Sequence, residues 1–179
     1  MLACSAEPEH IQPGYLIAPK LDGIRAIHVH DAGLLTRTLK PVPNRHLQHL
    51  WASPALHGLD GELILGDPTA TDVFRKTTSA VMSHAGEPEV VFHAFDDFTD
   101  PRSPYQDRLA RLELRVKILK NQGYPVVLVP QTLVAANNPL EAVETSLLAE
   151  GYEGVVARNP RATYKFGRST LREACLLKL

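Results

Sequence analysis

The apolar and polar positions of the first forty residues follow a pattern typical of short strands. The segments 15–21, 23–30 and 32–38 are rich in apolar and β-branched residues, and brief polar breaks separate them. Such runs, bounded by turn-forming residues, indicate strands joined by tight connections. We therefore predict that this part of the chain forms an antiparallel meander.

Helical spacing appears in four places further along the chain. Between 103 and 123, one helical face carries Leu109, Leu112, Val116 and Leu119, and the Asn-Gln-Gly sequence after them provides a stop. Shorter helices are predicted at 43–52 with Asn44 as the N-cap, at about 71–84 starting from Thr71 or Asp72, and at 139–151.

The remaining apolar runs are too short for helices and are bounded by glycine or proline. They predict strands at 58–66, 89–98, 126–134 with a break at Pro130, 153–158 and 174–179. The run at 89–98 has apolar or aromatic residues on both faces, which favours a place inside a sheet. The whole pattern predicts a single α+β domain over 1–179, with antiparallel sheets and helices inserted between the strands.

Composition is that of an ordinary globular protein rather than a disordered or fibrous one. Of the 179 residues, 44% are hydrophobic and 22% are charged. No apolar run approaches the ~20 residues needed to cross a bilayer, and the N-terminus has no basic leader followed by a hydrophobic segment. We therefore expect an intracellular, cytoplasmic protein without membrane association. Cys4 and Cys175 lack metal-ligand spacing and suggest two reduced thiols, with a bridge left open.

The net charge of −1 conceals a basic C-terminal part. Six cations stand there against Glu173 alone: Arg158, Arg161, Lys165, Arg168, Arg172 and Lys178. One interpretation is a phosphate-binding surface, and the other is an ordinary solvated segment.

Lys20, which stands between Pro19 and an Asp-Gly pair, opens a series of short motifs. An isolated Lys-x-Asp-Gly match is common by chance, but here further motifs follow it in a fixed order: Lys20 to Arg25, Thr36 to Thr38, Leu59 to Leu63, Phe92 to Asp96, Glu153 to Val156, and Leu176 to Lys178. The series resembles the motifs of the covalent nucleotidyltransferase superfamily. The wider phrases TRTLKPVPN, TTSAVMS and YKFGRSTL are similar to the adenylation domain of small ATP-dependent DNA ligases of the compact kind found in bacteriophages.

This resemblance covers the chain from about Tyr15 to the last residue and implies an ATP-grasp-like nucleotidyltransferase fold. It also implies a role for each motif residue. Lys20 would attack the α-phosphorus of ATP, and Lys178 would assist as a catalytic and nucleotide-binding cation. Glu153 would bind nucleotide and hold Mg²⁺ or Mn²⁺, Glu62 would contact the ribose, and Phe95 would stack on adenine.

The remaining roles concern phosphates and the turn that presents the lysine. Arg25 and Arg37 would bind ribose or phosphate oxygens, and Arg37 and Arg168 would contact DNA. Asp22 and Gly23 would shape the turn, with glycine supplying a positive φ. The implied partners of this monomer are ATP, AMP and nicked double-stranded DNA.

The proposed nucleophile explains why cations accompany it. A free lysine has a pKa of ~10.4 and is protonated at neutral pH, so it cannot attack until its surroundings favour the neutral amine. Nearby positive groups favour that form and also neutralise the charge that develops on the phosphate. In the family, AMP passes from the lysine to the 5′ phosphate of a nick, and the 3′ hydroxyl then displaces it.

Several alternatives remain at this level. Because Lys20 lies near the start, an NAD-specific domain before it is not expected, and capping enzymes usually carry Asp where this chain has Glu153. An RNA ligase core and a non-catalytic nucleotide-binding module stay open. The family usually continues as Lys-x-Lys into an oligonucleotide-binding barrel, so we expect this chain to be truncated within its last motif and to lack that barrel. His28 and His30 share a strand face but have no third metal ligand at a suitable spacing.

Overall fold

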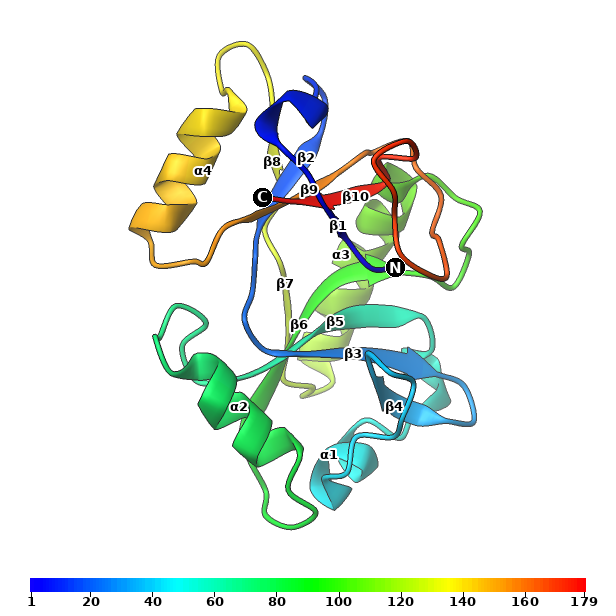
Figure 1. Ribbon diagram of the computed structural model, residues 1–179. Helices are drawn as coiled ribbons and strands as arrows, with labels where there is room; N and C mark the ends of the chain where they lie inside the picture. The colour runs from blue at the N-terminus through cyan, green and yellow to red at the C-terminus, as the bar shows by residue number, and fades with distance from the viewer. The chain divides into compact units, whose positions relative to one another are not determined.

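The computed structural model describes residues 1–179 and contains two five-stranded sheets (Figure 1). The chain divides into two compact units, each built on one sheet. The first unit comprises Met1–Leu21, Pro101–Arg108 and Val129–Leu179, and the second comprises Asp22–Asp100 and Leu109–Leu128. Both sheets are mixed but mainly antiparallel, which confirms the predicted α+β class.

The sheet of the first unit has the strand order β1-β10-β9-β2-β8. Its strands are β1 (Cys4–Ser5), β2 (Leu16–Pro19), β8 (Thr132–Leu133), β9 (Val155–Arg158) and β10 (Leu176–Lys178). The unit also contains the 3-10 helix η1 (Pro8–His10) and helix α4 (Leu140–Ala149), and helix α3 (Tyr105–Asn121) begins in it.

The sheet of the second unit has the order β4-β3-β5-β6-β7. Its strands are β3 (Ile24–Val29), β4 (Gly33–Thr36), β5 (Leu59–Leu65), β6 (Val90–Asp97) and β7 (Val126–Leu128). Helix α1 (Arg45–Leu50), the 3-10 helix η2 (Pro54–Leu56), helix α2 (Val73–Val81) and most of α3 complete the unit. As predicted, β6 is an interior strand.

The core of the second unit lies on one face of its sheet. Leu63 of β5 and Phe92 of β6 pack there, and the ring of Trp51, just after α1, lies 5.0 Å from that of Phe92. Helix α3 adds three of the four residues predicted for its apolar face, Leu112, Val116 and Leu119. Alternation along the strands therefore leaves the other residues of β3, β5 and β6 on the face away from this core.

The first unit has a separate core on its own sheet. Ile17, Ala157 and Leu177 occupy paired positions on β2, β9 and β10, and Val143 of α4 joins them. Residues one position away along these strands point to the opposite face. The motif lysines belong to that second set.

Local signals for the helix ends are confirmed. The side chain of Asn44 caps α1 by accepting a hydrogen bond from the backbone N–H of Leu47 at 3.0 Å. Asp72 is the N-cap residue of α2, and Gly123, with φ +87°, follows the end of α3. None of the helices is both long and apolar enough to cross a membrane.

The predicted meander of the first forty residues is wrong. Only β3 and β4 form a hairpin, because β2 pairs with β8 and β9 in the sheet of the other unit. The strand predicted at 126–134 is also divided between the sheets: β7 lies before Pro130 in one sheet, and β8 lies after it in the other. Local alternation indicates that a segment is a strand, but long-range pairing decides which strand lies beside it.

Candidate active site

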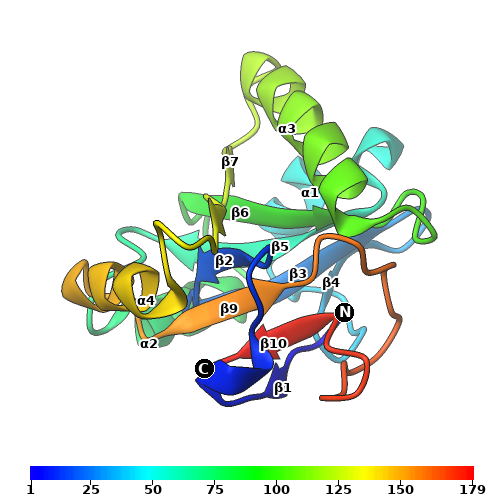
Figure 2. The same ribbon diagram turned by 90° about the horizontal axis from the view of Figure 1, so that it is seen from above.

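The first group of predicted site residues lies at one end of three adjacent strands of the first unit's sheet, β10, β9 and β2. Strand β9 runs antiparallel to both of its neighbours, β2 and β10, so its start lies beside the ends of those strands (Figure 2). Lys20 follows the end of β2, Glu153 precedes the start of β9, and Lys178 is the last residue of β10. Three motifs that are far apart in the sequence are therefore neighbours in the sheet.

Lys20 is held by both its backbone and its side chain. Its N–H donates to the carbonyl of Gly154 at 2.9 Å, and its ammonium donates to the Oε1 of Glu153. The Lys20 side chain is 25% exposed and that of Glu153 is 53% exposed, so the pair is open to a ligand. A side chain at Gly154 would come within 3.9 Å of Lys20 Cδ and 2.8 Å of the Leu179 carbonyl oxygen, which explains the glycine.

Lys178 lies on the same sheet face as Lys20. Its Cα is paired with that of Val156, which is paired in turn with Ala18 of β2. Because side chains two residues apart on a strand share a face, Lys20 follows Ala18 on that face. Alternation thus directs both lysines away from the core formed by Ile17 and Leu177.

The second group of predicted residues lies on the second unit's sheet, on the face away from its core. Arg25, Glu62 and His93 occupy directly paired positions on β3, β5 and β6, and they form a row across the three strands. Phe95 follows two residues after His93 and belongs to the same face of β6.

Arg25 is fixed by a buried carboxylate and covers an aromatic ring. Its Nε and Nη2 each donate to an oxygen of Asp60 at 2.5 Å, and Asp60 is fully buried. The guanidinium carbon lies 4.8 Å from the centroid of the Phe95 ring. Asp60 therefore positions Arg25, and Arg25 in turn packs on the ring predicted to stack on adenine.

Burial raises the pKa of the Glu62 carboxyl group to about 8. The nearby positive charge of Arg25 opposes this rise, and a hydrogen bond from the backbone N–H of Gly23 also favours the ionised form. The negative charges of Asp60 and Asp22 support the rise. Glu62 is therefore mainly a neutral acid at pH 7 in the protein without a ligand, and a further hydrogen-bond donor or a second cation would be needed to ionise it.

Gly23 is needed for space rather than for an unusual backbone conformation. Its φ lies outside the left-handed region, so the predicted positive φ is wrong. A Cβ at this position would overlap the carbonyl oxygen of Leu63 and lie 2.8 Å from Ile64 Cγ1 and 2.9 Å from Glu62 Cγ. The turn after Lys20 needs glycine because β5 passes directly against it.

The comparisons with known proteins agree with these motifs. The family described as "ATP dependent DNA ligase domain" matches residues 1–179. The chain belongs to this family.

Individual relatives of this ligase domain support the same conclusion. A "Probable DNA ligase" of Streptomyces griseus is 33% identical over 180 residues, which cover 85% of this chain and 33% of that protein. Two structures of Chlorella virus DNA ligase-adenylate are 35% and 34% identical with TM-scores of 0.78 and 0.81; they cover 99% and 100% of this chain and match 67% and 65% of theirs. The ligase domain thus spans about a third of the Streptomyces relative and two thirds of the viral one.

Arg37 is exposed, whereas several cations of the basic C-terminal part are buried or paired. Arg37 lies in the turn that follows β4. Arg168 is exposed but donates to the carbonyl of Ala3 at 2.5 Å. Of the other cations, Arg158 is buried against Tyr105, and Lys165 pairs with Glu173 at 2.6 Å, so only part of this segment forms an exposed basic surface.

The donor chemistry at Glu153 suits a hard divalent cation. Mg²⁺ is commonly held by one or two carboxylates together with substrate phosphates, and Glu153 provides one half-exposed carboxylate beside Lys20. No cluster of three or more His, Cys, Asp or Glu side chains is placed to hold a metal. His28 is buried with Nε2 2.8 Å from the Trp51 carbonyl oxygen, and His30 pairs with Asp31.

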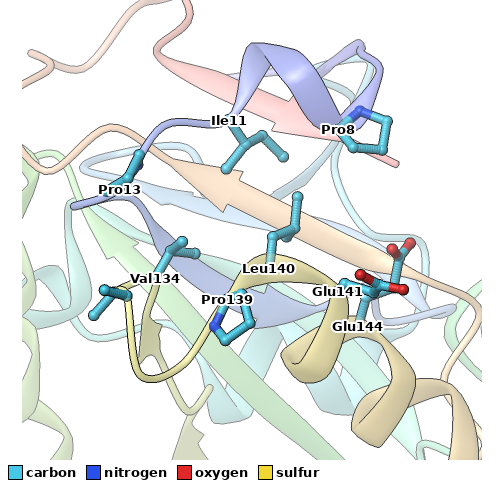
Figure 3. Close-up of a pocket in the computed structure, with 10 residues that line it drawn as sticks. Pro8, Ile11, Pro13, Val134, Pro139, Leu140, Glu141 and Glu144 are labelled. Carbon is cyan, nitrogen blue, oxygen red and sulfur yellow. The ribbon is translucent and has the colours of Figure 1, made fainter.

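The first unit also contains an apolar pocket of about 690 Å³ that includes none of the predicted site residues. Figure 3 shows it between η1, the segment after β8 and the start of α4, with Glu141 and Glu144 at one end. Pro8, Ile11, Val134 and Leu140 contribute apolar walls. Cys4 and Cys175, also in this unit, are both free thiols.

Two residues of the site were absent from the sequence-based set of site residues. Asp60 was given no role of its own within the Leu59 to Leu63 motif, although it is the buried partner of Arg25. His93 was not singled out at all. The spacing of His93 and Phe95 along β6 was the available signal, because residues two apart on a strand share a face.

Proposed function

We propose that this chain is the part of an ATP-dependent DNA ligase that binds ATP and accepts AMP on Lys20. The observation that carries the proposal is the pairing of Lys20 with Glu153, together with the position of Lys178 on the same face of the adjacent strands, because these residues come from three separate motifs. The solved viral relatives are described as ligase-adenylates, which agrees with a covalent adduct in this family.

In the proposed step, the neutral amine of Lys20 attacks the α-phosphorus of ATP. A nitrogen–phosphorus bond forms, the bond from the α-phosphorus to the bridging oxygen breaks, and pyrophosphate leaves with the electron pair. An ammonium that donates to Glu153 has no lone pair for this attack, so Lys20 must lose a proton and separate from the carboxylate. Lys178, on the same sheet face, offsets the charge that develops on the phosphate.

We assign the nucleoside to the row on the second unit's sheet. Phe95 stacks on adenine, Glu62 contacts the ribose, and Arg25 supports the ring of Phe95. Glu153 holds Mg²⁺ or Mn²⁺, and the bound ion supplies charge neutralisation at the phosphates. Ala18, two residues before Lys20, offers no polar side chain to the base, so in this proposal base selection rests on Phe95 and backbone groups.

The later steps belong to the whole protein. AMP moves from Lys20 to the 5′ phosphate of nicked DNA, and the adjacent 3′ hydroxyl displaces AMP to seal the nick. Arg37 and Arg168 are the exposed cations that we assign to DNA phosphates. This chain acts as a monomer in the proposal.

The test is intact-protein mass spectrometry after incubation with ATP and Mg²⁺. We expect the parent chain to gain one AMP moiety, the Lys20→Ala variant to gain none, and a Lys120→Ala control, which removes an exposed lysine of α3, to behave as the parent. ATP binding without any adduct, even in a longer chain that includes the barrel domain, would support a non-catalytic binding module instead.

A further inference from the structure

His93 lies in the row proposed to contact the nucleoside, yet the proposed mechanism gives it no role. Its Cα is paired with that of Glu62 across β5 and β6. Side chains at directly paired positions share a face, with Cβ atoms ~4.5–5.5 Å apart. Phe95 lies two residues further along β6, or ~6.8 Å at the usual rise of a strand. His93 therefore has the ribose-contacting residue on one side and the adenine-stacking residue on the other.

The His93 imidazole is polar, partly buried and without a hydrogen-bonding partner in the protein. Burial lowers its pKa to about 4, so the ring is neutral at pH 7. A neutral imidazole has one nitrogen that donates and one that accepts a hydrogen bond. Neither ring nitrogen of His93 is among the buried polar atoms that lack a partner, so both are open to solvent and can be reached by a ligand hydroxyl.

Glu62 of β5, the neighbour of His93, also lies close to the chain that leads into β3. The Glu62 side chain lies against Gly23, which precedes β3, since a Cβ at Gly23 would be 2.9 Å from Glu62 Cγ, whereas His93 stands on β6. The two side chains thus offer separate polar contacts on adjacent strands. A ribose presents two adjacent hydroxyl groups, each of which can donate and accept.

We propose that His93 is a specificity-determining residue that hydrogen-bonds one ribose hydroxyl of ATP, next to the hydroxyl contacted by Glu62. This inference rests on the proposed function, because it takes the nucleoside to bind against this sheet face. It adds a sugar contact from β6 and makes the pocket selective for ribonucleotides over both deoxyribonucleotide isomers.

The experiment measures binding of ATP, 2′-dATP and 3′-dATP to the Lys20→Ala protein by isothermal titration calorimetry, with and without His93→Phe. The Lys20→Ala background prevents adduct formation, so only binding is read. Phenylalanine keeps an aromatic ring and removes the hydrogen bond. We expect ATP to bind about 3- to 10-fold more weakly, as for loss of one neutral hydrogen bond. His93→Phe should lower the affinity for the deoxynucleotide that lacks the contacted hydroxyl by less than twofold. It should lower the affinity for the other deoxynucleotide as much as that for ATP.

Two further variants separate a ligand contact from a packing role. His93→Asn retains a donor and an acceptor and should recover most of the ATP affinity, and His93→Leu should repeat the selectivity change if the phenylalanine variant folds poorly. His30→Phe alters an exposed histidine of the same unit and should leave all three affinities unchanged. Fluorescence of Trp51, the only tryptophan and part of the same unit's core, checks that each variant is folded.

Equal weakening of all three nucleotides by His93→Phe, or no weakening of ATP, would overturn the inference about His93. The proposed function would survive either result if the parent chain still forms its Lys20 adduct. Failure of the Lys20→Ala protein to bind ATP at all would overturn the His93 contact, and failure of the parent to form an adduct would count separately against the proposed function.

Discussion

Replacing Gly23 by alanine tests the close packing beneath the turn that follows Lys20. The new Cβ would overlap the Leu63 carbonyl oxygen and crowd Ile64 and Glu62 at 2.8 and 2.9 Å. The backbone oxygen belongs to a paired strand and cannot rotate away, so the cost falls in the upper part of the ~1–3 kcal/mol range for overpacking. Alanine also lowers the entropy of the unfolded chain, which stabilises the folded protein by ~0.4–1 kcal/mol. The free energy of unfolding should therefore fall by about 2 kcal/mol in total.

Gly66→Ala is the matched control in the same unit. Its φ is +82°, but nothing lies within 4 Å of the new Cβ, so the control isolates the backbone cost. That cost is ~1–2 kcal/mol before the same entropic offset, or about 0.5–1 kcal/mol net. Urea unfolding followed by Trp51 fluorescence measures both variants. A Gly23→Ala loss no larger than that of Gly66→Ala would refute the argument from close packing.

Two further predictions concern charged groups of the second unit. The Glu62 carboxyl group has a pKa near 4.5 in the unfolded chain and about 8 in the folded chain. The free energy of unfolding is therefore unaffected by Glu62 ionisation below the lower pKa, and it falls as pH rises through this window. Between pH 6 and 9 the unfolding free energy of the parent should therefore fall by about 2–3 kcal/mol more than that of Glu62→Gln, measured in urea; parallel curves would contradict the raised pKa. Asp60→Asn should cost about 3–5 kcal/mol, because it leaves the Arg25 guanidinium largely buried without its carboxylate, and a loss below about 1 kcal/mol in the same assay would show that Arg25 does not depend on Asp60.

The positions of most elements were predictable because their signals are local. The Asn44 cap, the apolar face of α3 and the glycine after that helix depend on residues within a few turns of one another. Strand periodicity likewise located β5 and β6. Strand β1 was missed because two residues are too few to display a period.

The motif residues were also found from the sequence, but the reasons for them came from long-range contacts. Lys20 and Glu153 are 133 residues apart, and only the pairing of β2 with β9 brings them together. Gly23 was expected to supply a backbone conformation, whereas the approach of β5, some forty residues later, is what excludes a side chain.

The sequence by itself determined which segments are helices and strands and which side chains we propose for the chemistry, because periodicity, capping and motif order are properties of neighbouring residues. The tertiary structure alone decided that β2 and β3 enter different sheets, that Asp60 pairs with Arg25, and that His93 stands beside Glu62. Each of these depends on strand partners and register, which are set by the burial of whole sheet faces rather than by any local pattern.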